Sequence, residues 1–238
     1  MKYFIFDMDD TLYLRSEPFV RACIQCFPES AGWDPEKLYL TRKKHSDFSY
    51  DEYIAGRMSK DDMYIYRTAE TFLEYNISLT PEEALAFEEQ YSRMQGEIRL
   101  QPGMKACLQF LKNAGAPMFV ITNGPAKRQR SKLQALDITS YIPETHWLIS
   151  GEIGIDKPDP RIFQHAVQSF GISAEEAWYI GDSFEADVVG AFRAGWHSIW
   201  LNHRLESAGN GAFADYTVTS CEALNQLFQA LFRAETGK

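Results

Sequence analysis

The sequence predicts an α/β protein with a doubly wound, mostly parallel sheet of five strands and an inserted all-helical cap domain. Three observations support this prediction. After residue 101, short runs of apolar, β-forming residues alternate with amphipathic helical segments, which is the pattern of parallel strands joined by helices. One more apolar run lies alone at residues 3–6. Between these two parts, residues 14–100 contain helical patterns without a convincing strand.

The first apolar run ends in a group of carboxylates. Tyr3–Phe6 is apolar throughout, as expected for a strand buried on both faces of a parallel sheet, and Asp7, Asp9, Asp10 and Thr11 follow it. Carboxylates this close repel one another, so a fold that gathers them needs a cation or a proton between them. Open α/β sheets bind ligands at the carboxyl ends of their strands. The stretch therefore predicts a functional site rather than a solvated acidic turn.

Residues 14–100 predict the helical cap. Asp34 before Pro35 can cap a helix, and Thr80 with Glu83 forms a capping box. The expected helices span residues 16–27, 35–45, 50–57, 60–75 and 81–95. We therefore expect a core domain of residues 1–13 and 101–238 and a cap domain of residues 14–100.

The alternating part supplies the remaining strands, which we expect at residues 117–121, 145–150, 177–180 and 198–201. Helices are expected at residues 104–113, 125–136, 160–170, 185–195 and around 224–231. Within the second of these, Lys127, Arg128, Arg130 and Lys132 predict an exposed basic face, on which Lys127 or Arg128 could reach a substrate.

Polar residues follow several of these strands. Thr122 and Asn123 follow the second strand, and Lys157 precedes a proline further on. Asp182 follows the fourth strand, and Asp187 lies in the first turn of the next helix, so both can face one oxygen-preferring cation. A lysine beside a carboxylate cluster can screen the repulsion and hold a phosphoryl group.

Four motifs in order, D-x-D-x-T, T-N-G, K-P and G-D-x-x-x-x-D, resemble those of the haloacid dehalogenase-like (HAD) superfamily. The cap fits the members in which a helical cap is inserted directly after the first motif, although it matches only in position and helicity. Residues 148–163 and 178–202 look most like 5′-nucleotidases and sugar-phosphate phosphatases. The resemblance implies a Rossmann-like core.

This resemblance implies a Mg²⁺-dependent phosphomonoester hydrolase acting on a small organic phosphate, such as a nucleoside monophosphate or a sugar phosphate. Asp7 would attack phosphorus and form an aspartyl-phosphate, and Asp9 would act as general acid and then as general base. Mg²⁺ would be bound by Asp7, the backbone carbonyl of Asp9, Asp182 and Asp187.

The phosphoryl group would be held by the remaining motif residues, namely Thr11, Thr122, Asn123 and Lys157. One position departs from the commonest pattern, because Asp10 stands where glycine is frequent. We expect its side chain to face away from the metal.

Three alternatives stay open at this stage. A phosphomutase would need a cap group that returns the phosphoryl group to the substrate. A 2-haloacid dehalogenase is disfavoured because those enzymes lack the second carboxylate, which is Asp9 here. The third alternative is a non-enzymatic module, either a phospho-accepting signalling domain or a ligand-binding protein that has lost catalysis.

Bulk properties limit the partners. The 24 basic and 33 acidic residues give a net charge of −9, which argues against a nucleic-acid polymer. No apolar run approaches the roughly 20 residues of a membrane span, and we expect a cytoplasmic protein that does not bind membranes. We expect a monomer whose partner is a small phosphorylated metabolite.

Overall fold

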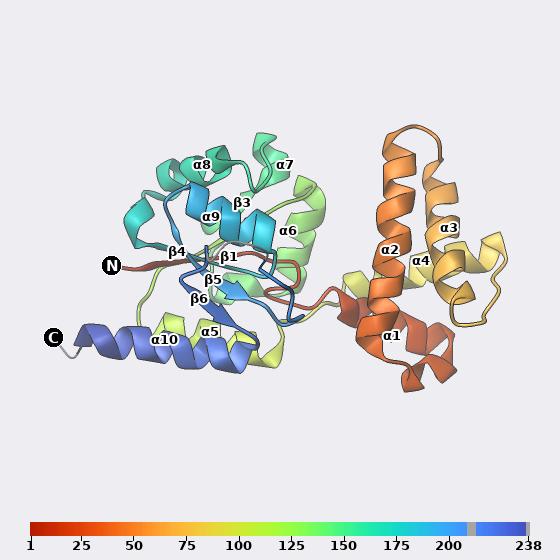
Figure 1. Cartoon of the computed structure of the whole chain (residues 1–238), viewed down its shortest axis with the longest axis horizontal. Coiled ribbons are helices and arrows are strands. Elements are labelled where there is room, and N and C mark those ends of the chain that lie inside the picture. The colour runs from red at the N-terminus through yellow and green to blue at the C-terminus, as the bar shows by residue number, and fades with distance from the viewer. Residues whose placement is uncertain (209–212, 237–238) are drawn as a thin grey trace. The chain divides into compact units, whose positions relative to one another are not determined.

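A computed structural model describes residues 1–208 and 213–236. The chain divides into two compact units, one of residues 1–14 and 99–238 and the other of residues 15–98 (Figure 1). These limits lie one or two residues from the expected domain boundaries. That the two units are separate folding domains stays a prediction.

The first unit contains a parallel sheet. Over the described residues its strand order is β3-β2-β1-β4-β5-β6, and each neighbouring pair is parallel. The strands are β1 (Tyr3–Phe6), β2 (Met118–Thr122), β3 (Trp147–Ile149), β4 (Ala177–Gly181), β5 (His197–Leu201) and β6 (Tyr216–Val218). The α/β prediction is confirmed, but the sheet has six strands rather than five. The sixth was missed because it is a three-residue edge strand with two exposed residues, too short to give a periodic apolar signal.

Helices pack on both faces of this sheet. Figure 1 shows α5 (Pro102–Asn113) and α10 (Cys221–Thr236) along one face and α8 (Pro160–Phe170) and α9 (Gly190–Arg193) on the other. Phe4 of β1 packs edge-on against Phe228 of α10, whereas its neighbour Ile5 belongs to a cluster that includes Phe163 of α8. Adjacent strand residues point to opposite faces, so burial of both faces explains why β1 is apolar throughout.

The order of the strands places a functional site beside β1. The chain runs from β1 outward to β2 and β3, then crosses back so that β4 pairs with the other side of β1. Phe6 pairs with Val120 of β2 and Ile180 of β4, so these three strands end at about the same level. This reversal is the switch point at which open α/β sheets bind ligands.

Further helices complete the first unit. They are α6 (Ala126–Ala135), α7 (Ser150–Ile153) and the short turns η2 (Ile138–Ser140), η3 (Glu144–His146), η4 (Ala174–Glu176) and η5 (Phe184–Val189). The helix that the sequence predicts at residues 185–195 is present as the π-helical turn η5 followed directly by α9. Among the described residues, no helix combines the length and the apolar character needed to cross a lipid bilayer.

The second unit is helical and has its own core. It consists of α1 (Ser16–Cys26), η1 (Pro28–Gly32), α2 (Pro35–Ile54), α3 (Lys60–Leu73) and α4 (Pro81–Gln95). Phe19, Phe72 and Phe87 are buried together in this core. Asp34 caps α2, and the predicted capping box of Thr80 and Glu83 is present at α4.

One prediction about this unit is wrong. The sequence predicted two helices at residues 35–45 and 50–57, but α2 continues without a break through Ile54. Residues 46–49 contain neither proline nor glycine, so nothing there prevents the helical backbone from continuing. These residues were left outside both predicted helices.

Candidate active site

Three carboxylates meet at the carboxyl edge of the sheet. Asp7 follows β1, Asp182 follows β4 and Asp187 belongs to the turn after β4; one carboxylate oxygen of each lies within 4.8 Å of the others. Asp7 and Asp187 are buried. Oxygen ligands from clustered carboxylates are the donor set that hard divalent cations prefer. The three side chains therefore fit a divalent metal ion.

Local structure brings Asp187 into this cluster. The backbone N–H of Ser183 donates to Asp187 Oδ2 at 3.0 Å, and the Ser183 hydroxyl accepts from the N–H of Ala186 at 3.2 Å. Gly181 ends β4 directly beneath the carboxylate, since a Cβ at this position would lie 2.2 Å from Asp187 Oδ2. Only glycine leaves room for the carboxylate at this point of the chain.

Lys157 joins two of the clustered carboxylates. Its Nζ lies 2.6 Å from Asp7 Oδ1, 2.7 Å from Asp187 Oδ1 and 2.7 Å from the hydroxyl of Tyr179. These contacts use all three ammonium hydrogens. Burial alone would lower the pKa of Lys157, but the carboxylates of Asp187 and Asp7 outweigh burial and raise it well above its usual value. Lys157 is therefore a fixed positive charge.

Asn123 holds the backbone that carries Lys157. Its side chain accepts from the N–H of Lys157 at 2.8 Å and donates to the carbonyl of Lys157 at 2.9 Å. Both ends of the amide are therefore used in positioning Lys157. The sequence predicted that Asn123 holds a phosphoryl group, and that contact stays a prediction.

The charge on Asp7 is only partly compensated. Burial raises its pKa to about 7; the ammonium of Lys157 opposes this rise, and the nearby carboxylate of Asp187 adds to it. Two buried carboxylates thus share one ammonium group, which leaves the cluster short of positive charge. A bound cation would supply that charge.

Asp9, two residues after Asp7, lies in a different environment. Its carboxylate receives Lys132 Nζ at 2.6 and 2.9 Å, the hydroxyl of Tyr13, and Gln129 Nε2 at 2.9 Å. Burial alone would raise the pKa of Asp9, but Lys132 and these hydrogen bonds lower it to about 2. The two aspartates of the first motif therefore have opposite electrostatic surroundings.

These contacts correct one prediction. The basic run in α6 was expected on an exposed face, but Lys132 is only 8% exposed and pairs with Asp9. Gln129, which had no predicted role, is 2% exposed. The signal that could have revealed both is their spacing with Leu133 and Leu136, because positions i, i+3, i+4 and i+7 share one helix face.

The two predicted threonines are buried near the strand ends. Thr122 ends β2, and its hydroxyl accepts from Gln129 Nε2 at 2.8 Å. Thr11 is fully buried, and among the residues described its hydroxyl has no hydrogen-bond partner. A phosphoryl contact of either hydroxyl stays a prediction.

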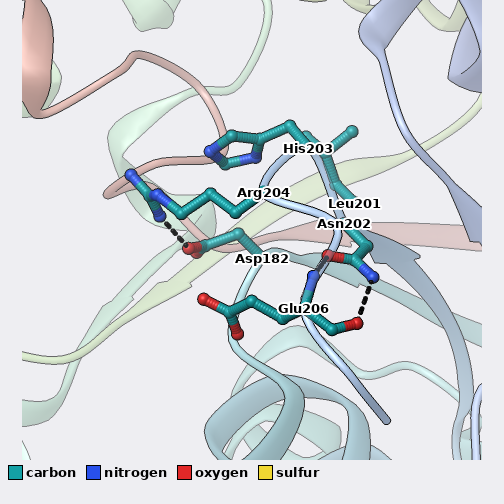
Figure 2. Close-up of a pocket in the computed structure, with 6 residues that line it drawn as sticks. All are labelled: Asp182, Leu201, Asn202, His203, Arg204 and Glu206. Atoms are coloured by element: carbon teal, nitrogen blue, oxygen red, sulfur yellow. Dashed lines mark hydrogen bonds and ion pairs between the residues drawn. The ribbon is translucent and has the colours of Figure 1, made fainter. Parts of the chain in front are cut away.

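Arg204 was not predicted as part of the site. Its Nη1 lies 3.4 Å from Asp182 Oδ2, the contact drawn in Figure 2 beside the loop after β5. Its Nη2 lies 3.2 Å from Asp10 Oδ2. Asp10 is fully buried, has a left-handed backbone with φ of 62°, and is not one of the three clustered carboxylates. Arg204 thus links the Asp10 side chain to the edge of the carboxylate cluster.

The chain belongs to the family of haloacid dehalogenase-like hydrolases. The match to this family extends over residues 1–195 of the 238. This finding confirms the resemblance that the four motifs indicated.

Several relatives that the chain matches are named as phosphatases. A phosphoserine phosphatase from Thermus thermophilus is 36% identical over 138 residues, 58% of this chain and 55% of that protein. A glyceraldehyde 3-phosphate phosphatase from Methanopyrus kandleri is 30% identical over 82% of this chain and 81% of its own. A pyrimidine 5′-nucleotidase from Escherichia coli is 30% identical over 53% and 55% of the two chains. The chain thus spans little more than half the length of two of these relatives.

Solved structures share the fold. A HAD-type hydrolase from Bacillus subtilis, determined with bound magnesium, matches with a TM-score of 0.69 at 21% identity and covers 95% of this chain and 97% of that chain. At this identity the likeness establishes the architecture alone.

Proposed function

We propose that the protein is a Mg²⁺-dependent phosphomonoester hydrolase that acts on a small organic phosphate through an aspartyl-phosphate on Asp7. The observation that supports this most is the placement of Asp7, which is buried against Lys157 within a cluster of three carboxylates. A nucleophilic carboxylate that attacks phosphorus needs positive charge around the transferred group, which Lys157 and a cation bound by the carboxylates would supply. Relatives named as phosphatases support the same reaction class.

Asp7, Asp182 and Asp187 would hold the Mg²⁺ ion, together with the backbone carbonyl of Asp9. When bound, the ion neutralises negative charge on the phosphoryl oxygens. The oxygen-only donor set and the pKa of Asp7, which burial raises to about 7, favour a hard divalent cation here.

The reaction uses the two aspartates of the first motif in sequence. In the substrate-free protein Asp9 is ionised beside Lys132, because its pKa is about 2, so it takes up a proton as the anionic substrate binds. The Asp7 carboxylate attacks phosphorus, the ester P–O bond breaks, and Asp9 gives that proton to the departing oxygen. Asp9 then takes a proton from the water that attacks phosphorus, which releases inorganic phosphate and restores Asp7. Lys157 stabilises the charge that develops between Asp7 and the phosphoryl group.

The remaining motif residues would bind the substrate. Thr11, Thr122 and Asn123 lie near the strand ends, and the buried Thr11 hydroxyl is available to donate to a phosphoryl oxygen. Arg204 stays at the edge of the metal cluster through Asp182.

The names of the relatives indicate the class of substrate. The relatives are named for a phosphorylated amino acid, a triose phosphate and pyrimidine nucleotides, all of which are small phosphate esters. We propose a small phosphorylated metabolite as substrate, and neither a nucleic-acid polymer nor a membrane as partner. We also propose a cytoplasmic monomer; its four free cysteines suit a reducing compartment.

The test is release of inorganic phosphate from a panel of phosphoserine, triose phosphates, hexose phosphates and nucleoside monophosphates. Wild type, Asp7→Asn and Asp137→Asn are assayed with Mg²⁺ and with EDTA. Asp137 is an exposed residue of the same unit, in a left-handed conformation that asparagine also adopts, so it serves as the matched control.

We expect release that requires both Mg²⁺ and Asp7 and that the control variant retains. Release by Asp7→Asn at the wild-type rate would refute the proposal. Transfer of the phosphoryl group to a second position of the substrate, without phosphate release, would instead indicate a mutase.

A further inference from the structure

The acid/base carboxylate is held by side chains that no motif accounts for. Lys132 Nζ contacts both oxygens of Asp9, Tyr13 donates to Oδ1, and Gln129 Nε2 donates to Oδ2. Lys132 also lies over the ring of Tyr13, with 5.8 Å from Nζ to the ring centroid. Contacts to both oxygens fix the rotation of the carboxylate as well as its place.

Two of these side chains come from one face of α6. Gln129 and Lys132 are three residues apart, and Leu133 and Leu136 share their buried face. Burying an ammonium group is unfavourable unless it is paired, so a lysine at this position needs the carboxylate it contacts. A lysine with only a packing role would direct its ammonium group to water.

Gln129 also connects Asp9 to the end of β2. Its Nε2 lies 2.8 Å from both the Thr122 hydroxyl and the carbonyl of Asn123. Gly124 makes room for it, because a Cβ there would lie 3.1 Å from Gln129 Cδ, and its φ of 134° is one that other residues rarely adopt. The turn after β2 is thus shaped around the amide of Gln129.

We propose that Lys132 and Gln129 are positioning residues that hold the Asp9 carboxylate in place for proton transfer to the leaving group. The inference rests on the proposed function, in which Asp9 takes up a proton when the substrate binds and gives it to the ester oxygen as the P–O bond breaks. Transfer needs the carboxylate within hydrogen-bond reach of that oxygen, and the Asp9 side chain turns freely about two bonds unless it is held.

This role has a specific kinetic consequence. An alkoxide leaves poorly without a proton, whereas p-nitrophenolate leaves as a stable anion and needs none. A defect in proton delivery therefore slows the hydrolysis of alkyl phosphates and has little effect on the hydrolysis of p-nitrophenyl phosphate. The ratio kcat/KM is the right quantity, because it reports the steps up to departure of the leaving group and not the later attack by water.

The experiment compares kcat/KM for p-nitrophenyl phosphate and for the best alkyl phosphate of the substrate panel. The variants are Lys132→Met, Lys132→Arg and Gln129→Leu, with Lys105→Met and Gln134→Leu as controls at exposed positions of the same unit. We expect Lys132→Met to lower kcat/KM for the alkyl phosphate at least ~10-fold and for the aryl phosphate less than ~3-fold, because misplacing a general acid forfeits part of its ~10²–10⁴-fold contribution. Lys132→Arg should recover much of the loss, and Gln129→Leu should show the same selectivity more weakly.

A double-mutant cycle tests whether Lys132 acts through Asp9. In an Asp9→Asn background, Lys132→Met should cause no further fall in kcat/KM for the alkyl phosphate. Equal losses for the two substrates, additive losses in the cycle, or no loss at all would each overturn the inference. If the Lys132→Met variant does not fold, the same double-mutant cycle with Gln129→Leu in place of Lys132→Met tests the inference.

Failure of the two proposals can be told apart. If the wild-type protein releases no phosphate, or if the release does not depend on Asp7, the proposed function is wrong and this inference is wrong with it. Release that depends on Asp7 but shows no leaving-group selectivity in the Lys132 and Gln129 variants overturns this inference alone.

Discussion

Replacing Lys157 by methionine should destabilise the metal-free first unit by about 3–5 kcal/mol, the usual cost of removing one partner from a buried ion pair. Lys157, Asp7 and Asp187 have side chains that are 3%, 9% and 2% exposed, so water cannot compensate the two carboxylates that remain. Methionine has a similar volume, so little of the loss should come from packing. A cation bound by the same carboxylates should replace much of the missing charge, and saturating Mg²⁺ should therefore reduce the difference from wild type.

Urea unfolding followed by tryptophan fluorescence can measure this effect. Trp147, Trp178, Trp196 and Trp200 belong to the first unit and only Trp33 to the second, so the signal mainly reports the unit that contains Lys157. Lys105→Met is the control for loss of a surface charge. A loss below about 1 kcal/mol in EDTA, or an equal loss with and without Mg²⁺, would refute the reasoning.

Three further predictions concern the metal cluster and the helical unit. Gly181→Ala should displace the Asp187 carboxylate and weaken Mg²⁺ binding at least ~10-fold by calorimetry; unchanged affinity would contradict the site geometry. The pKa of Asp7 is raised to about 7, so below that pH a proton competes with Mg²⁺ for this carboxylate, and the affinity for Mg²⁺ should fall about tenfold per pH unit. A Mg²⁺ affinity that does not change with pH would exclude Asp7 as a ligand. Arg42→Met leaves Glu88 buried with Arg67 as its remaining ion-pair partner and should cost about 2–4 kcal/mol in thermal unfolding; a change under 0.5 kcal/mol would show the pair to be unimportant.

The linkage of Asp7 to stability has a definite sign. Its folded pKa of about 7 is above the ordinary value of 3.8, so the folded protein binds this proton more tightly than the unfolded chain does. The stability contributed by protonated Asp7 is present in full below about pH 4 and is lost as the pH rises through 7. Asp7→Asn should therefore flatten the pH dependence of metal-free stability between these values.

Much of the site could be predicted because its signals are local. A buried strand is apolar whatever surrounds it, and parallel strands bring their carboxyl ends to one edge of the sheet. Asp7 and Asp182 could therefore be placed together from the residues that directly precede them. Asp187 could be added from its distance along the next helix.

The residues that were missed depend on three-dimensional neighbours. Lys132 belongs to a basic run, and only the arrangement of α6 against the first motif buries it beside Asp9. Arg204 follows β5 in a loop, where sequence spacing says little about side-chain contacts. The sequence indicates that Tyr179 is a core residue of β4, and the structure agrees, but its hydroxyl also contacts Lys157. A hydrophobic pattern counts such a side chain as apolar and therefore does not indicate a contact made by its polar atom.

The most direct test of the central claim is to identify the residue that carries the phosphoryl group during turnover. Asp9→Asn, which should slow hydrolysis of the intermediate, is mixed with p-nitrophenyl phosphate and Mg²⁺ and quenched in acid, and the tryptic peptide of residues 3–15 is analysed by mass spectrometry. The account predicts one phosphoryl group on Asp7, absent when Asp7→Asn is also introduced. A phosphoryl group on another residue, or nitrophenol release with this peptide unmodified throughout, would contradict it.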